Sequence, residues 1–558
     1  MPAVASPISL PRPLLSRSTL WTALALLAAV AVLVLLRLHT ADESLERDIV
    51  IHAIIGNEFL HGRSLYSDLW NHKPPASFLI HAAFNQVFGF GPQYILAMNL
   101  VFNTATLLAI FGLGLALTRN RFAAVCAAVL WALLSFDMDM QANQPNSEAL
   151  VNPMFAGGIL LWYAVSERWV SDRWAFLAGF LFFVTTYFKQ HFVFVPIAIA
   201  LAFLTHAALF ARPDFVRQLR IAVWTGAVGC VGWLLVFAVF WLQGSLKPFF
   251  EAAFLYNEGY GGNWLYNIKR AYWMGIFPAW SAGALYPYLP VTAVGVLGAL
   301  LSRHWKPLLV MLAWLGSTFL IVVVPGRFFA HYYQLWIPPL LVGTAFCVHY
   351  LLRLPRPVGV ALAASVLLAA LGYTGVRLKD HVSYQAWQWS AKKYPGDRFN
   401  ESRAIGEALA RGLPRAEPVF FFGRDPGLFL YGGLRAVNGK IYVRWFNDNK
   451  YSPALLAHAI AQFKEARFDV VVVNSKPTEF GAEEIGEALL RDFVMVPECF
   501  AHNEVWVRRG SPHLATLERT LLPASQELLP RYGVKPESCE QTTSKLLLAP
   551  AKTGHGES

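Results

Sequence analysis

Residues 47–75 read RDIVIHAIIGNEFLHGRSLYSDLWNHKPP and lie between the first long apolar run of the chain and the next. Asp48 stands near the start of this stretch, and Lys73 opens the Lys-Pro-Pro that ends it. Between them, residues such as Ile51 and Ile54 are spaced for one apolar face of a helix. An acid and a lysine held just outside a membrane-embedded bundle indicate a site, for which the rest of the chain is the scaffold.

The composition is that of an integral membrane protein. Apolar residues make up 56% of the 558 residues and charged residues only 15%, whereas soluble domains have about 25% charged residues. The net charge is +11, but the positive residues stand largely in short loops between apolar runs, where they orient a chain in a membrane. We therefore expect contact with membrane lipids and no binding to nucleic acid.

Apolar runs near 20 residues long predict about eleven membrane-spanning helices. They are centred near residues 28, 105, 129, 157, 181, 200, 230, 294, 315, 343 and 367. Only residues 188–191 separate the runs near 181 and 200, so a sharp turn and one long broken helix both fit. The shorter run at 76–90 is predicted to be re-entrant or interfacial.

Arginine and lysine predict the orientation of these helices. With the N-terminus in the cytoplasm, every predicted cytoplasmic loop is short and has at least two positive charges. These loops carry Arg119 and Arg121; Arg168 and Arg173; Arg212, Arg217 and Arg220; Arg303 and Lys306; Arg353 and Arg356. The prediction is a multi-pass membrane protein with an odd number of helices, whose C-terminal part lies outside the cytoplasm.

Two domains are predicted. Residues 1–376 form the transmembrane domain, with outer loops 38–92 and 243–287, and residues 377–558 form a smaller extracytoplasmic α/β domain. Its predicted strands are 418–423, 440–446, 468–475 and 503–509, and its predicted helices are 452–467 and 483–491. Cys499 and Cys539 lie in this domain and can form a disulfide if it is extracytoplasmic.

The acids of interest all fall on the predicted outer side: Asp48, Asp137, Asp139 and Glu148. Ionisable groups at the mouth of a membrane bundle indicate a functional site. Structural interpretations fit the same residues. Glu148 follows Asn-Ser and suits a helix N-terminus, Asp48 suits a helix cap, and Lys73 suits a surface lysine in a proline-rich turn.

The first outer loop resembles that of the polytopic GT-C glycosyltransferases, in particular the group that includes protein O-mannosyltransferases and lipid A aminoarabinose transferases. The matching motifs are the turn with Gly62, Tyr66 and Asp68; Lys73-Pro74-Pro75; Asn146-Ser147-Glu148; Lys189-Gln190; and GRFFAHYYQLWIPP at 326–339. The resemblance implies a GT-C fold. The family often has an Asp-Glu pair as its acid, but Asp42-Glu43 lies six residues too far from Gly62. Asp48 fits the spacing and is preferred.

The resemblance also implies a reaction. The donor is a sugar on a polyprenyl (undecaprenyl or dolichyl) phosphate, and the acceptor is a lipid such as lipid A, a glycan or a protein. Asp48 is the expected base, with Glu148 orienting the acceptor or sharing that role, and the anomeric carbon is inverted. The residues expected to bind the donor phosphate are Lys73, Lys189, Arg327, His331 and Tyr332. As alternatives, Arg327 anchors the chain at the interface, and His331 and Tyr332 belong to an aromatic belt.

Further substrate contacts are expected from Tyr66, Asp68, Asp137, Asp139 and Tyr260. Tyr260 lies in the glycine-rich loop 243–287, which is either a lid over the donor or an interfacial amphipathic segment. The carboxylates are compatible with Mg²⁺ or Mn²⁺, but no compact ligand motif appears and no metal ligand is assigned. The turn at 423–426 either helps to hold the acceptor or is structural.

Two other classes of protein compete with the enzyme. A transporter or flippase of lipid-linked precursors is expected to place ionisable residues or broken helices near the middle of the membrane. Here the acids gather on one side, which favours the enzyme. A non-catalytic assembly subunit is the third interpretation, and the presence of Asp48, Lys73 and Glu148 argues against it.

Overall fold

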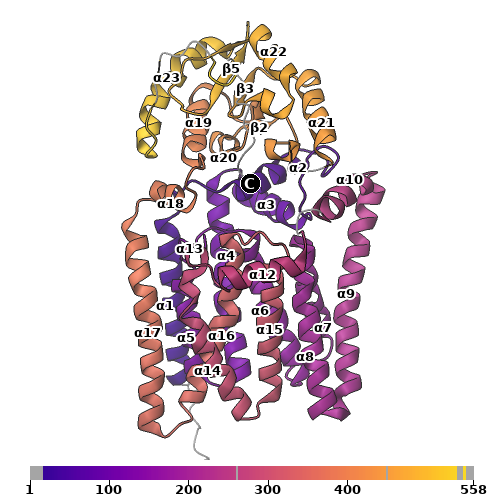
Figure 1. The fold of residues 1–558 in the computed structure, drawn as a ribbon, viewed down its shortest axis with the longest axis vertical. Coiled ribbons are helices and arrows are strands. Elements are labelled where there is room, and N and C mark those ends of the chain that lie inside the picture. The colour runs from indigo at the N-terminus through magenta and orange to yellow at the C-terminus, as the bar shows by residue number, and fades with distance from the viewer. Residues whose placement is uncertain (1–16, 259–261, 448–449, 537–538, 540–543, 548–558) are drawn as a thin grey trace, which may run out of the picture.

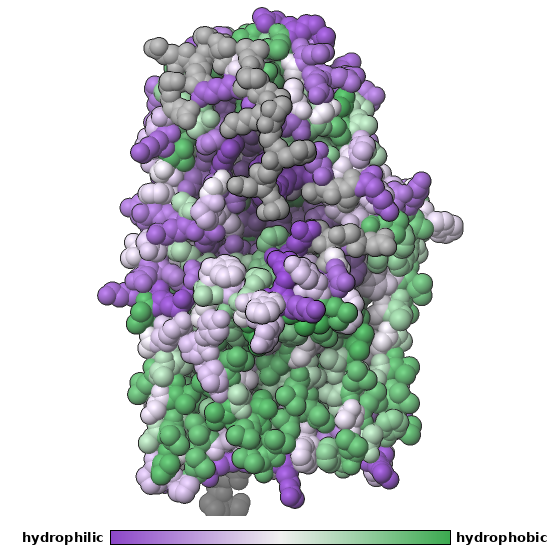
Figure 2. All heavy atoms as spheres, viewed as in Figure 1, coloured by the Kyte–Doolittle hydropathy of each residue, from purple (hydrophilic) through white to green (hydrophobic). Residues whose placement is uncertain are grey.

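The computed structural model describes residues 17–258, 262–447, 450–536, 539 and 544–547. It has two layers, a bundle of long helices and a smaller domain with a β-sheet stacked on one end of the bundle (Figure 1). Figure 2 shows that hydrophobic residues dominate the surface of the bundle and hydrophilic residues that of the smaller domain. We call the smaller domain the outer domain.

All eleven predicted apolar runs are helical. The bundle helices are α1 (Arg17–His39), α4 (Pro92–Thr118), α5 (Arg121–Leu134), α6 (Ser147–Ser166), α7 (Trp174–Phe188), α8 (Phe194–Phe210), α9 (Phe215–Leu242), α14 (Tyr288–Leu301), α15 (Trp305–Val323), α16 (Ile337–Leu351) and α17 (Arg356–Ser383). In the described part of the chain, 8 helices are long and apolar enough to cross a membrane, or up to 9 if the bent pair Ala279–Leu285 and Tyr288–Leu301 is one span. The runs near 129 and 181 form shorter helices of 14 and 15 residues.

The loops predicted to be cytoplasmic meet at one end of the bundle, away from the outer domain. Glu167 pairs with Lys306 at 2.6 Å and with Arg119 at 3.6 Å. Asp172 pairs with Arg217 at 2.6 Å. The positively charged loops therefore share one side, as the charge pattern predicts.

Helices α2 (Arg47–Leu60) and α3 (Ala76–Phe88) lie between the bundle and the outer domain (Figure 1). The side chain of Glu46 caps α2 by accepting hydrogen bonds from the backbone N–H groups of Asp48 and Ile49. The two helices approach closely at Gly56, where a Cβ atom would stand 2.8 Å from the carbonyl oxygen of Phe78. With 13 residues, α3 is too short to span a bilayer, as predicted for this run.

The outer domain is built on a five-stranded sheet with the order β2-β1-β3-β5-β4. The strands are β1 (Pro418–Phe422), β2 (Arg435–Ala436), β3 (Val470–Val473), β4 (Phe493–Met495) and β5 (Glu504–Arg508). Strand β1 is parallel to β2 and β3, while β5 is antiparallel to β3 and β4. The helices are α18 (Ala386–Lys393), α19 (Phe399–Gly412), α20 (Gly427–Gly432), α21 (Ser452–Glu465), α22 (Glu483–Asp492) and α23 (Leu514–Arg531).

Most of the predicted strands and helices of this domain are confirmed, but the strand at 440–446 is wrong. That segment ends in a 3₁₀ helix, Val443–Phe446. Lys440 donates from Nζ to the carbonyl oxygen of Asp68 at 2.8 Å, and Trp70 donates from its backbone N–H to Gly439 at 3.1 Å. These contacts hold the segment against the first outer loop. The predicted boundary at 376/377 falls within α17, which ends at Ser383.

Cys499 and Cys539 form a disulfide across 40 residues, a pairing that the sequence alone left open. It ties residue 539 to the segment that precedes β5. Next to it, the buried Glu504 carboxylate accepts hydrogen bonds from the backbone N–H groups of Lys545 and Leu546. The end of the described chain is thus fastened to the sheet.

The loop at 243–287 contains α10 (Leu246–Phe250), a five-residue π-helix (Glu251–Leu255), α11 (Tyr256–Glu258), α12 (Trp264–Met274) and α13 (Ala279–Ala282). Helix α12 exposes Tyr272 and Trp273. From the same helix, Asn267 and Arg270 donate to the carbonyl oxygens of Val324 and Gly326, both at 3.0 Å. Tyr260 lies outside the described residues, and the lid stays a prediction.

Candidate active site

Two lysine–carboxylate pairs lie at the end of the bundle that faces the outer domain. Lys73 Nζ is 2.5 Å from Asp48 Oδ2, and Lys189 Nζ is 2.5 Å from Glu148 Oε1. The side chains of Lys73, Lys189 and Glu148 are 12%, 9% and 2% exposed, whereas that of Asp48 is 43% exposed. Lys189 and Glu148 are thus buried, Lys73 is nearly buried, and the Asp48 side chain is half-buried.

The two pairs form one electrostatic unit, which we call the four-charge cluster (Asp48, Lys73, Glu148, Lys189). Each carboxylate also interacts electrostatically with the lysine of the other pair: Glu148 with Lys73, and Asp48 with Lys189. Asp48 is in the first turn of α2, Glu148 is in the first turn of α6, and Lys189 stands in extended backbone between α7 and the 3₁₀ turn that leads to α8. Residues far apart in sequence are therefore brought to one place.

The segment at 326–332 borders this cluster. His331 interacts electrostatically with all four of its charges, and its Nδ1 is 3.1 Å from Gln141 Oε1. The ring of Tyr332 lies 4.5 Å from Lys189 Nζ. Arg327 interacts electrostatically with His72, the neighbour of Lys73 in the chain. All the residues predicted for catalysis and for binding the donor phosphate thus lie together, and their roles are still predictions.

The buried His52 also contacts Lys73. It follows Asp48 by one helical turn, and its Nε2 is 3.3 Å from Lys73 Nζ. Burial, and then repulsion from Lys73, lowers the pKa of His52 well below its usual value. The ring is neutral at physiological pH and can accept a hydrogen bond from the ammonium. Sequence reasoning missed His52, although its i, i+4 spacing from Asp48 was a usable signal.

The protonation states follow from burial and pairing. Burial disfavours the charged form of both Asp48 and Lys73, but their mutual attraction outweighs it. The pKa of Asp48 is therefore lowered and that of Lys73 raised. Burial, followed by repulsion from Asp48, raises the pKa of Glu46 to about 7. At neutral pH the site contains the Asp48 carboxylate, the Lys73 ammonium and a partly protonated Glu46.

Of the other predicted substrate contacts, Asp137 and Asp139 lie away from the four-charge cluster, whereas Tyr66 touches it. Asp137 and Asp139 both pair with Arg377 of α17, at 2.8 and 2.6 Å. Tyr66 is buried, and its hydroxyl donates to the carbonyl oxygen of Lys73 at 2.8 Å. Tyr66 therefore positions the backbone of Lys73, while Asp137 and Asp139 join α17 to the loop before α6.

Asp42 and Glu43, the alternative acids, are occupied by the outer domain. Asp42 pairs with Arg403, and Glu43 pairs with Lys393, both at 2.5 Å. The side chains of Glu43 and Lys393 are both fully buried. Asp42 and Glu43 thus contact the outer domain, and Asp48 as the acid of the site stays a prediction.

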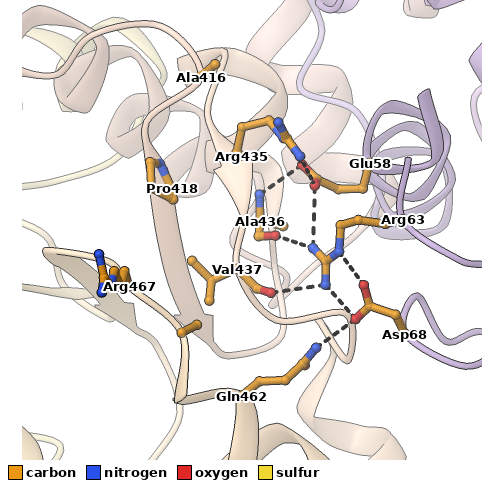
Figure 3. A pocket seen from close by; sticks show the side chains of 11 residues that line it. Glu58, Arg63, Asp68, Ala416, Pro418, Arg435, Ala436, Val437, Gln462 and Arg467 are labelled. Carbon is orange, nitrogen blue, oxygen red and sulfur yellow. Dashed lines mark hydrogen bonds and ion pairs between the residues drawn. The ribbon is translucent and has the colours of Figure 1, made fainter. Parts of the chain in front are cut away.

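Asp68 lies in a separate cavity of about 460 Å³ between α2 and the outer domain (Figure 3). There Arg63 pairs with Asp68 at 2.6 Å, and Glu58 accepts two hydrogen bonds from Arg435, both 2.7 Å long. Gln462 of α21 donates to Asp68 at 2.7 Å. These bonds clamp the C-terminal end of α2 to the outer domain, which sequence reasoning did not anticipate.

Arg47 makes the equivalent contact at the N-terminal end of α2. It pairs with Asp425 at 2.7 Å and with Asp397 at 2.8 Å. Its guanidinium also lies over the ring of Tyr442. Because Asp425 belongs to the predicted turn at 423–426, this turn stands beside the residue that precedes Asp48.

No group of three or more His, Cys, Asp or Glu side chains in the described part of the chain could hold a metal ion. The carboxylates of the four-charge cluster are each paired with a lysine. The side chains that the structure describes thus assemble no divalent-metal site, and a bound Mg²⁺ or Mn²⁺ stays a prediction.

The fold is similar to that of ArnT from Cupriavidus metallidurans. The structure of ArnT bound to undecaprenyl phosphate matches with a TM-score of 0.57 and 13% identity, over 90% of this chain and 99% of that chain. ArnT in the apo state gives a TM-score of 0.56, 14% identity and the same coverage. The oligosaccharyltransferase AglB from Archaeoglobus fulgidus, in complex with an inhibitory peptide and a dolichol-phosphate, gives a TM-score of 0.49 and 13% identity. The match covers 85% of this chain and 73% of that chain.

No protein-family model matches the sequence, and no curated protein matches it significantly. At 13–14% identity the likeness to ArnT concerns the fold. The chain is therefore an α-helical multi-pass membrane protein of the GT-C fold, with a C-terminal α/β domain stacked on the end of the bundle that holds the four-charge cluster.

Proposed function

We propose that this protein is a glycosyltransferase that moves a sugar from a polyprenyl phosphate to an extracytoplasmic acceptor. The observation that carries the proposal is the four-charge cluster, at the mouth of a GT-C bundle and next to the outer domain. ArnT, which has the same fold, has been solved with undecaprenyl phosphate bound. If the lipid tail of a donor stays in the bilayer, its phosphate group must bind at the end of the bundle, where the four-charge cluster lies.

The charges of the site suit a phosphodiester. Lys73, Lys189 and Arg327 are cationic, and Asp48 and Glu148 are anionic, which leaves one positive charge. A polyprenyl-phosphate sugar carries one negative charge on its phosphate. Lysine ammonium groups bind phosphate oxygens through charge-assisted hydrogen bonds. One donor molecule therefore neutralises these five groups when Glu46 is protonated.

The pairing of Lys73 with Asp48 links donor binding to activation of the base. Lys73 lowers the pKa of Asp48 and so makes it a weak base while the two are paired. When a phosphate oxygen takes the hydrogen bond of Lys73, that constraint on Asp48 weakens. The neutral ring of His52 keeps the ammonium in place during the exchange.

The reaction then proceeds by a single displacement. The acceptor hydroxyl or amine gives its proton to Asp48, and its oxygen or nitrogen forms a bond to the anomeric carbon. The bond from the anomeric carbon to the phosphate oxygen breaks, and polyprenyl phosphate leaves with an additional negative charge. Lys73 and Lys189 stabilise that charge. Attack opposite the phosphate inverts the anomeric carbon.

In the proposed reaction, lysine ammonium groups neutralise the phosphate charge, a role that Mg²⁺ or Mn²⁺ has in metal-dependent enzymes. Glu148, paired with Lys189, orients the acceptor or the phosphate-binding lysine. The turn at 423–426, beside Arg47, is the part of the outer domain that we assign to the acceptor, which is lipid A, a cell-envelope glycan or a protein.

We place the protein in the bacterial inner membrane, with the positive loops in the cytoplasm and the four-charge cluster at the periplasmic face. The disulfide between Cys499 and Cys539 supports this orientation, because disulfides persist in oxidising compartments. The contacts among the positively charged loops at the opposite end support it as well.

The test uses the purified full-length chain in detergent micelles, where a flippase has no second leaflet to serve. A panel of undecaprenyl-phosphate sugars is supplied with an outer-membrane lipid extract, and release of undecaprenyl phosphate is measured together with sugar on the acceptor. We expect one donor to be consumed, with a rate reduced about 100-fold or more in Lys73→Met. The exposed Lys379→Met serves as the matched control. Folded wild type that consumes no donor would contradict the proposal.

A further inference from the structure

Arg37 is a buried cation without an anionic partner among the described residues. It stands at the outer end of α1 and is 1% exposed. Its guanidinium donates to neutral oxygens only, those of Asn99, Asn103, Ser135 and Ala142. Its Nη1 has no hydrogen-bond partner in the part of the chain that the structure describes. A buried charge of this kind is costly unless something compensates it.

Arg37 lines a small cavity together with Gln144, which is 2% exposed. Gln144 accepts a hydrogen bond at Oε1 from the backbone N–H of Glu46, which fixes its amide so that Nε2 is the donor. Its Nε2 faces the Glu43 carboxylate, with which the Gln144 side chain interacts. The cavity is thus lined by a neutral amide and by Arg37, whose charged Nη1 is an unsatisfied donor.

The N-terminus of α4 contributes to the same cavity. Pro92, Ile95 and Leu96, from the first turn of this 27-residue helix, line it. The residue before the helix, Gly91, provides no side-chain cap. The first turn of a long helix carries a partial positive charge and favours anions. The ion pair of Glu43 with Lys393, which interacts with Arg37, has no net charge of its own and leaves the charge of Arg37 uncompensated.

We propose that this cavity binds a small monovalent inorganic anion, with chloride as its chemical class. The cavity measures about 30 Å³, which is room for one water-sized or monatomic group. A water molecule can accept the hydrogen bond of Arg37 Nη1 but leaves the guanidinium charge uncompensated. The bound anion links α1, α4 and the loop at 143–145, which leads directly into Glu148 at the start of α6. The site is a structural one and does not depend on the proposed glycosyl transfer.

The test is the thermal unfolding of the purified full-length chain while chloride replaces gluconate at constant ionic strength. We expect the Tm to rise with the logarithm of the chloride concentration above the Kd, by about 3 °C for each tenfold increase. Bromide should act in the same way. An unchanged Tm at constant ionic strength would overturn the proposal, because a cavity that holds water has no chloride dependence.

A carboxylate built into the cavity should replace the anion. We expect Gln144→Glu to keep its Tm in gluconate and to lose the chloride dependence, while the exposed Arg17→Gln keeps it. The same chloride dependence in Gln144→Glu as in wild type would place the anion elsewhere and overturn the proposal. If Gln144→Glu does not fold, the anion is located instead by anomalous scattering from wild-type crystals grown in bromide. A bromide peak beside Nη1 of Arg37 supports the site, and peaks only elsewhere overturn it.

Discussion

At the scale of single residues, the site depends on charges that are buried in pairs. Lys73 and Lys189 each have a carboxylate at 2.5 Å, and His52 adds a neutral acceptor for Lys73. A phosphate group that enters the site competes with these carboxylates for the lysines. The same groups can therefore be stable without a donor and reactive with one.

The titration of Glu46 gives a prediction at this scale. The pKa of Glu46 is raised from 4.5 to about 7 by burial and then by Asp48. Between these pH values the folded chain binds more protons than the unfolded chain, so the free energy of unfolding falls as pH rises, by about 1–3 kcal/mol. Glu46→Gln cannot ionise and keeps one acceptor for the cap of α2. We expect its Tm to change less between pH 5 and pH 8 than that of wild type.

The exposed Glu465→Gln is the matched control for this experiment and should keep the pH dependence of wild type. Asp48 does not interfere, because its lowered pKa places its titration below this window. If the Tm of Glu46→Gln and that of wild type fall by the same amount between pH 5 and pH 8, Glu46 is not the titrating group.

At the scale of elements, α2 is the helix on which the site depends. Its N-terminal end carries Asp48 and His52, and both ends are fastened to the outer domain, through Arg47 and through Glu58. The helix itself was predictable from the spacing of Ile51 and Ile54. Its fastening was not, because Glu58 and Arg435 are 377 residues apart in the chain and no local pattern relates them.

The clamp at Glu58 leads to the second prediction. The Glu58 side chain is 1% exposed and pairs with both Arg435 and Arg63. Glu58→Gln removes the negative charge and leaves two guanidinium groups facing each other. We expect a loss of roughly 3 kcal/mol in the free energy of unfolding, measured by denaturant unfolding in detergent. The exposed Glu483→Gln should change stability by less than about 0.5 kcal/mol, and an equally small effect of Glu58→Gln would show that the clamp carries no stability.

At the scale of the whole molecule, hydropathy and charge predicted the bundle well. Long apolar runs and positive loops are one-dimensional signals, and every predicted run is a helix. The outer domain was less predictable. Segment 440–446 has the composition of a strand, but contacts with the first outer loop decide its conformation. The pairing of Lys73 with Asp48, and of Lys189 with Glu148, arises only when four separate segments meet.

The third prediction concerns the orientation of the molecule. A disulfide that closes 40 residues stabilises the outer domain by about 3–4 kcal/mol, and it forms only if this domain faces an oxidising compartment. In intact cells we expect Cys499 and Cys539 to react with a maleimide only after reduction. Cys499→Ser, which frees Cys539, is the control for labelling. If both thiols of the wild type react with the maleimide without a reductant, the outer domain faces the cytoplasm.

The most direct test of the account is the rate of sugar transfer by Asp48→Asn, measured with the donor that wild type consumes. Asparagine keeps the shape of the side chain but cannot accept the proton of the acceptor. We expect the rate to fall about 100-fold or more, while Tm and undecaprenyl phosphate binding persist. The remote Asp469→Asn, in the outer domain, should transfer sugar at the rate of wild type. Transfer by folded Asp48→Asn at the rate of wild type would contradict the assignment of the four-charge cluster as the active site with Asp48 as its base.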